Sequence, residues 1–158
     1  MIKSFPAFEP TPDREPFWFL GGRARILLPG PATGNALSLM EFSDPIGHAP
    51  PHHVHENEEE LWFVLDGEVS FFVGDERHDL IAGQVAHGPR GVPHSYLVRS
   101  EGARIAVVFS PACIEEWFRA NGTPVGEAGD LPPAFDLAAV VGSAAAFSLR
   151  VTGPPPTL

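Results

Sequence analysis

Short runs of apolar residues, bounded by Gly, Pro, Asn or Asp, recur along the chain as far as residue 110. In several of these runs apolar and polar residues alternate, as they do from Arg23 to Leu28, which is typical of a strand with one buried face. Strands are expected at 17–20, 23–28, 36–42, 61–65, 69–73, 77–81, 84–87, 94–98 and 104–109. Many short strands separated by turn residues predict an all-β sandwich or barrel.

After residue 110 the apolar spacing becomes helical. Ser110-Pro111 suits an N-cap followed by proline at the first helical position, and Asn121-Gly122 suits the end of that helix. A second helical face is expected from Leu137 to Ser148, and the proline-rich tail from Gly153 cannot continue a regular element. We therefore expect one domain, 1–158, with a barrel core at about 17–110 and a helical extension at about 111–158. The residues before about Pro16 are expected to run extended over the surface.

The composition fits a compact globular protein that does not bind nucleic acid. A chain of 158 residues can bury roughly two thirds of its unfolded surface in a single domain. The net charge is −10 and Lys3 is the only lysine, which argues against nucleic acid and against a polybasic membrane contact. Cys113 is the only cysteine, and the first residues lack the apolar core of a signal peptide. We expect a cytoplasmic protein whose partner is a small molecule.

Three histidines and one glutamate are spaced so that β geometry can bring them together. His53 and His55 would project from one face of a strand, because side chains two residues apart do so. Glu60 opens the next apolar run, which Asp66-Gly67 is expected to close as a hairpin through a type I′ turn. Together with His94, these residues suit one divalent transition metal per chain (Fe, Mn, Ni, Co, Cu or Zn) and leave about two octahedral positions open.

The same residues resemble the two sequence motifs of the cupin superfamily. The first motif, G-x5-H-x-H-x4-E-x6-G, is matched by Gly47, His53, His55, Glu60 and Gly67. The second, G-x5-P-x-G-x2-H-x3-N, is matched by Gly83, Pro89, Gly91 and His94, with Val98 in place of the final Asn. The resemblance implies a conical β-barrel (a double-stranded β-helix, or jelly roll) with one or two C-terminal α-helices. It also implies that His53, His55, Glu60 and His94 hold the metal, and its spacing favours Glu60 over Glu59.

Within the superfamily, the chain most resembles the small bacterial single-domain proteins similar to quercetin 2,3-dioxygenase. In such dioxygenases a flavonol binds the metal through its deprotonated 3-hydroxyl and is cleaved by dioxygen with loss of carbon monoxide. The resemblance implies a metal-dependent oxygenase for a small enolic or phenolic compound, with Glu60 as catalytic base and Trp62, Phe72 and Tyr96 in the substrate wall. It also implies a homodimer. Two alternatives stay open: a non-oxidative isomerase or cyclase that uses the metal as a Lewis acid, and a binding module without catalysis.

The remaining chemically active residues carry no motif, and ordinary roles are expected for them. His48, His52 and His78 are expected at the surface, and His87 as a structural histidine. Glu58 is expected to be solvated, and Cys113 to be buried packing, as free cysteines most often are.

Overall fold

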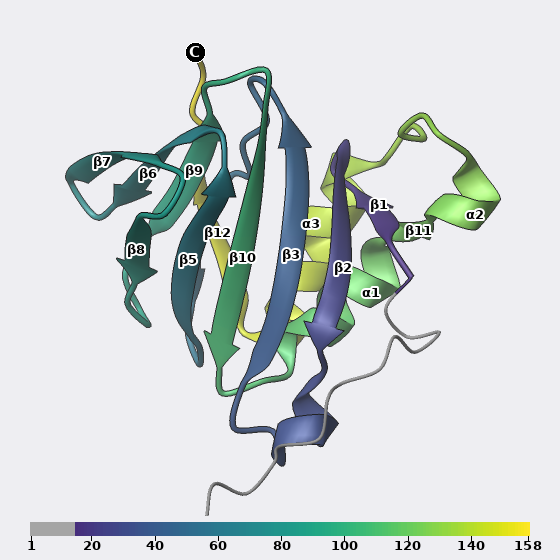
Figure 1. Ribbon diagram of the computed structural model, residues 1–158. Helices are drawn as coiled ribbons and strands as arrows, with labels where there is room; N and C mark the ends of the chain where they lie inside the picture. Colours follow the sequence, from purple (N-terminus) through teal and green to yellow (C-terminus); the bar gives the residue numbers. More distant parts are fainter. Residues whose placement is uncertain (1–14) are drawn as a thin grey trace, which may run out of the picture.

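The structure is a computed structural model that describes residues 15–158, so most of the expected extended N-terminal segment lies outside the described residues. Two antiparallel sheets face each other (Figure 1). In spatial order, the seven-stranded sheet contains β11 (Thr123–Pro124), β1 (Phe17–Phe19), β2 (Gly22–Leu28), β3 (Ser38–Pro45), β10 (Gly102–Ser110), β5 (Glu59–Asp66) and β8 (Val85–Gly88). The five-stranded sheet contains β12 (Leu149–Gly153), β4 (His52–His55), β9 (His94–Val98), β6 (Glu68–Val73) and β7 (Glu76–Ile81).

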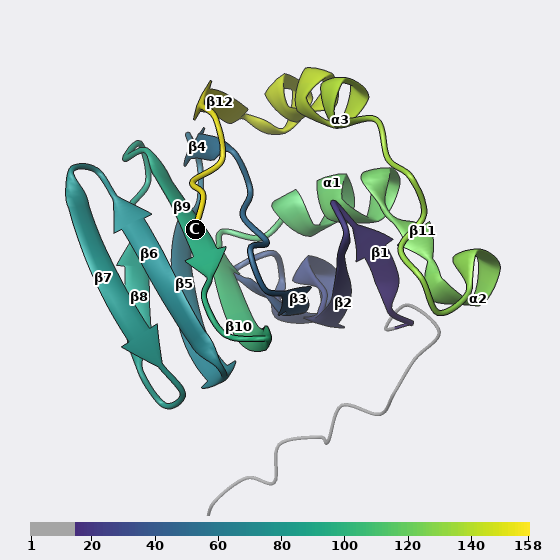
Figure 2. The ribbon, with the colours of Figure 1, turned by 90° about the horizontal axis from the view of Figure 1, so that it is seen from above.

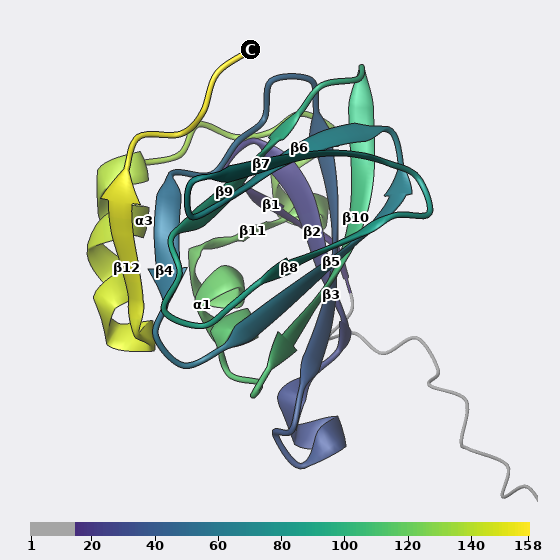
Figure 3. The ribbon, with the colours of Figure 1, turned by 90° about the vertical axis from the view of Figure 1, so that its left-hand side faces the viewer.

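The alternating pattern of the sequence sets which face of each strand is buried. In β2, Ala24 and Ile26 are buried while Arg23 and Arg25 are exposed, and β10 alternates in the same way. The inward residues of the two sheets meet in one hydrophobic core, whose largest members include Trp62, Phe71 and Phe109. The sequence-based expectation of an all-β barrel is confirmed, and Figure 3 shows the two sheets curving around a common interior.

The link between β5 and β6 differs from the expected hairpin. The two strands do not pair: β5 lies between β10 and β8, whereas β6 lies between β9 and β7 in the other sheet. Gly67 has a φ of +83° and Asp66 is not in the positive-φ region, so the type I′ prediction was wrong. The turn carries the chain from one sheet to the other and so brings β6 opposite β5. Strand β3 also extends through Asp44-Pro45, beyond the predicted end of this strand at residue 42.

The structure contains the predicted C-terminal helices, but the first begins later than predicted. α1 spans Ile114–Asn121, and Ser110 remains the last residue of β10, where it pairs with Glu59. Its hydroxyl donates to the carbonyl oxygen of Ala36 at 2.9 Å instead of capping a helix. The expected apolar face is present, with Ile114 and Trp117 buried. Within residues 15–158, no helix has the length and apolar character needed to cross a membrane.

The second helical segment is shorter than predicted, and a strand follows it. α3 spans Leu137–Ala144 and is followed by a short 3-10 turn, η3 (Ala145–Phe147). A further short helix, α2 (Val125–Ala128), lies between α1 and α3. Ser148 has a φ of +56°, so it does not continue the helical face. β12, which the sequence did not predict, pairs with β4 and lies with α3 along one flank of the barrel (Figure 3). Viewed from above, α1 and α3 lie at the end of the molecule where β1 and β2 lie (Figure 2).

Candidate metal centre

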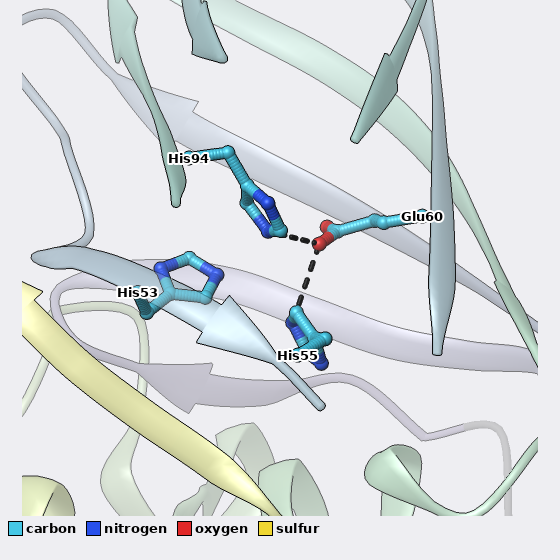
Figure 4. A group of neighbouring side chains, drawn as sticks. All are labelled: His53, His55, Glu60 and His94. Atoms are coloured by element: carbon cyan, nitrogen blue, oxygen red, sulfur yellow. Dashed lines mark hydrogen bonds and ion pairs between the residues drawn. The ribbon is translucent and has the colours of Figure 1, made fainter. Parts of the chain in front are cut away.

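Three strands bring the predicted ligands to one point inside the barrel. His53 and His55 project from the same side of β4, and His53 lies directly opposite His94, the first residue of β9. Glu60 reaches the same point from β5, in the facing sheet (Figure 4). One donor atom from each of the four side chains lies within 4.8 Å of every other. The structure therefore assembles the complete predicted set.

Each histidine ring is anchored through its Nδ1 atom. The Nδ1 of His53 lies 2.7 Å from the carbonyl oxygen of Pro51, and that of His94 lies 2.9 Å from the carbonyl oxygen of Val92. The Nδ1 of His55 lies 3.3 Å from a carboxylate oxygen of Glu58. An Nδ1–H that donates to an acceptor leaves the lone pair on Nε2, and this is the arrangement that orients a metal-binding imidazole.

Glu60 is held at both carboxylate oxygens. Its Oε2 lies 3.0 Å from the Nε2 of His94 and 3.3 Å from the Nε2 of His55 (Figure 4). Its Oε1 accepts a hydrogen bond of 2.7 Å from the indole N–H of Trp62. Gly88 makes room for that indole, since a Cβ at this position would overlap the Trp62 ring. One oxygen of Glu60 thus faces the histidines while the other is fixed from behind.

The ionisable side chains of the centre shift one another's pKa values. Burial alone would raise the pKa of Glu60, but hydrogen bonds from His55 and His94 hold it well below its usual range. Burial alone would lower the pKa of His55, but Glu58 and Glu60 raise it to about 9. Burial lowers the pKa of His53 to about 3, and the neighbouring His94 and His55 add to the effect. Without a metal, the buried carboxylate is therefore stabilised by a protonated His55, so the centre favours a positive charge beside Glu60.

The donor set fits a divalent transition metal. Three imidazole nitrogens and one carboxylate oxygen converge on one point, which is the mixed ligand type that Mn, Fe, Co, Ni, Cu and Zn accept. The anchored Nδ1 atoms supply the outer hydrogen bonds that such sites need. In an octahedral shell, four protein ligands would leave about two positions open for a substrate or water.

A largely apolar cavity lies beside this centre. His53, His55 and Glu60 form part of its wall. The remainder comes mostly from aromatic and aliphatic side chains of β1, β3 and β10, of helices α1 and α3, and of β12; these include Phe19, Phe42, Val107, Trp117, Phe118, Val140, Leu149 and Val151. The metal centre therefore opens onto a space suited to an apolar ligand.

The three residues predicted for the substrate wall lie in different places. Tyr96 lines the cavity. Trp62 is buried behind Glu60, to which its indole N–H donates, and its ring packs edge-on against that of His94. Phe72 is not among the cavity-lining residues: it points to the outer side of β6, where its ring packs against His52 and Arg77. Alternation on β6 explains this, because Val69 and Phe71 take the inward positions.

Several residues expected to be unremarkable belong to the site. Glu58, predicted to be solvated, is buried against His55. His48, predicted to be at the surface, lines the cavity and lies near the buried Asp44. The His-x-x-Glu spacing of residues 55–58 was the only sequence signal for Glu58, and none existed for Asp44.

Other expectations concern residues outside the cavity. His78 and His87 are exposed and lie near Glu76 and Glu59 respectively, so neither contacts the centre. His52 is only half-buried. Cys113 is exposed, contrary to its predicted packing role, because it precedes the first turn of α1 instead of lying in the core. Val98, which replaces the usual Asn, is buried in the core.

Two facing antiparallel sheets that enclose three histidines and a glutamate define the cupin class of metal-binding barrels. The cupin domain family model matches residues 40–110, and the chain belongs to the cupin superfamily. It is similar to quercetin 2,3-dioxygenase of Bacillus subtilis, with 32% identity over 117 residues, which is 73% of this chain and 34% of that protein. It is also similar to an uncharacterized protein of Streptomyces coelicolor, with 39% identity over 54 residues, which is 34% of this chain and 51% of that protein.

A solved structure supports the fold. An RmlC-like cupin from Shewanella frigidimarina superposes with a TM-score of 0.58 at 18% identity, over 70% of this chain and 96% of that one. At that identity the likeness concerns the barrel alone. The matched part of this chain spans only about a third to a half of the two curated relatives, at 34% and 51% of their lengths.

Proposed function

We propose that the protein is a metal-dependent oxygenase, similar to quercetin 2,3-dioxygenase, that acts on a small enolic or phenolic compound. The observation that carries the proposal is the convergence of three histidines and Glu60 at the wall of an apolar cavity. The similarity to the Bacillus subtilis dioxygenase supports the choice of reaction. An apolar cavity with one ionic end suits a ring compound that carries an acidic hydroxyl.

His53, His55, Glu60 and His94 would hold the metal. When bound, any of the metals that fit this site supplies Lewis acidity, and Fe, Mn, Co, Ni or Cu would also supply the redox capacity that dioxygen chemistry requires, which Zn lacks. If held partly off the metal, Glu60 would accept the proton of the substrate hydroxyl at Oε2, the oxygen that faces the histidines, while Trp62 holds Oε1. Phe42 and Trp117 would lie against the apolar part of the substrate and exclude water from the reacting end.

Oxygen uptake with quercetin tests the proposal. Protein purified without an affinity tag is first analysed for bound metal, and uptake is then measured with the loaded protein. We expect near-stoichiometric metal and uptake that is lost in Glu60→Gln, His53→Ala and His94→Ala. Glu59→Gln is the matched control, because Glu59 is adjacent in sequence but pairs with the exposed His87.

Three outcomes would contradict the proposal. Uptake that survives all three ligand substitutions would remove the metal centre from the reaction. Product formation under strict anaerobiosis would indicate the non-oxidative isomerase or cyclase. Stabilisation by quercetin with no product would indicate a binding module.

A further inference from the structure

A second group of polar side chains, Tyr96, His48 and Asp44, lies farther along the barrel from the metal centre, and Tyr96 belongs to the same strand as His94. Tyr96 projects from the same face of β9 as His94, two residues or about 7 Å along the strand. The backbone of His48 pairs beside Val98, four residues or about 13 Å from His94, with the Val98 N–H donating to the His48 carbonyl at 3.0 Å. The His48 ring stacks on that of Tyr96, with centroids 6.1 Å apart.

A buried carboxylate supports this pair. The Tyr96 hydroxyl donates to Oδ2 of Asp44 at 2.7 Å, and Oδ1 of Asp44 lies 3.7 Å from the Nε2 of His48. Gly22 leaves the space that Asp44 occupies, since a Cβ there would overlap its carboxylate. Burial raises the pKa of Asp44, while His48 and Tyr96 act in the opposite direction. Burying a carboxylate is costly without such partners, so Asp44 is held where it can orient His48.

His48 is the side chain of this group that can hydrogen-bond a ligand in the cavity. Among the described residues that line the cavity, the side chains outside the metal centre with a hydrogen-bonding group are His48, Tyr96 and Trp117, and the Trp117 N–H already donates to Ser143. The Tyr96 hydroxyl is already committed to Asp44 as a donor. An imidazole with one nitrogen toward Asp44 still has a second nitrogen that can hydrogen-bond a ligand.

We propose that His48 is a specificity-determining residue that hydrogen-bonds a polar group on the end of the substrate remote from the metal. The preferred substrate is then a flat, mainly apolar ring compound with an enol or phenol at one end and a second hydroxyl or carbonyl at the other. This inference rests on the proposed function for the position of the first polar end. The position of the second polar end of the substrate follows from His48, Asp44 and Tyr96 alone.

Paired flavonols measure this contact. Binding of quercetin and of 3-hydroxyflavone, which lacks the remote hydroxyls, is measured by fluorescence titration of the zinc-loaded protein, so that no turnover intervenes. We expect the wild-type protein to prefer quercetin by about 3- to 10-fold more than His48→Leu does, the effect of one neutral hydrogen bond. Affinity for 3-hydroxyflavone should be nearly the same in both proteins. His48→Gln, which retains a hydrogen-bonding group, should keep much of the preference, and His78→Leu, at the surface, should keep all of it.

An equal preference in the wild-type protein and His48→Leu would overturn the inference, as would failure of both flavonols to bind. The inference and the proposed function fail separately. Oxygen uptake with both flavonols and no His48-dependent preference would leave the oxygenase standing without this contact. A preference that depends on His48, with no oxygen uptake, would leave the contact standing and remove the oxygenase.

Discussion

Removal of the Glu58 carboxylate is expected to weaken metal binding without removing a ligand. Glu58 and His55 are both buried, with side chains 3% and 2% exposed, and the Glu58 carboxylate is the partner of the His55 Nδ1. In Glu58→Leu that N–H would be buried without an acceptor, and the ring would lose the contact that turns its Nε2 toward the centre. Loss of such an outer hydrogen bond typically costs about 10–100-fold in metal affinity.

The geometry sets where in that range each variant falls. The His55–Glu58 distance of 3.3 Å is longer than an ideal N–H···O bond, so the contact itself is of moderate strength. Glu58→Gln keeps an acceptor oxygen but loses the charge, and we expect a loss of about tenfold. Glu58→Leu also leaves a buried donor unsatisfied, which costs about 1–3 kcal/mol, and should approach a hundredfold loss.

Competition with a chelator of known zinc affinity gives the dissociation constants directly. Glu59→Gln provides the control, because this neighbouring carboxylate faces the outside and contacts His87. Wild-type affinity in Glu58→Leu would refute the argument that Glu58 orients His55. An equal loss in Glu59→Gln would show that general negative charge, rather than this contact, supports the metal.

Two further predictions concern stability, each measured by urea unfolding. Gly67→Ala should destabilise the fold by at least about 1 kcal/mol more than Gly91→Ala. Both glycines have a positive φ, but only at Gly67 would a Cβ overlap backbone atoms, which here belong to β10. Equal losses of stability in the two variants would contradict this overlap. Burial would raise the pKa of Glu41, but hydrogen bonds from Arg25 and Arg104 lower it. The contribution of the ionised Glu41 carboxylate to the free energy of unfolding is therefore present above the unfolded pKa of 4.5 and is lost as the pH falls through the lower folded pKa. Glu41→Gln should therefore cost about 1.5 kcal/mol at pH 7 and progressively less below pH 4.5, and a cost independent of pH would refute this assignment.

The fold and the proposed ligands were accessible from sequence because their signals are local. Alternation places His53 and His55 on one face of β4, and the spacing of the two cupin motifs indicated Glu60 and His94, which lie on other strands. The β5–β6 turn shows the limit of this reasoning. Asp66-Gly67 has the composition of a hairpin turn, yet the pairing of β5 with β10 and β8 decides that the chain crosses to the other sheet.

Residues that support the centre were harder to recognise because their roles depend on what faces them. Glu58 belongs to an acidic run that resembles a solvated surface, and only the approach of His55 makes it a buried partner. His48 reaches the cavity because its backbone pairs with Val98, fifty residues away in sequence. Such distant pairing leaves no local pattern in a single sequence.

The cavity wall also depends on contacts between distant parts of the chain. β12, which was not predicted, supplies Leu149 and Val151 beside the ligand strand β4, from nearly a hundred residues further along the chain. The Trp117 indole N–H donates to Ser143 at 2.8 Å, so α1 and α3 are joined where both line the cavity. The wall thus combines residues that lie among the motif residues, such as His48 and Tyr96, with residues from the C-terminal segment. A matching motif therefore argues for the metal centre, whereas the substrate preference that we propose involves His48, which is not a fixed position of either motif, and the C-terminal segment.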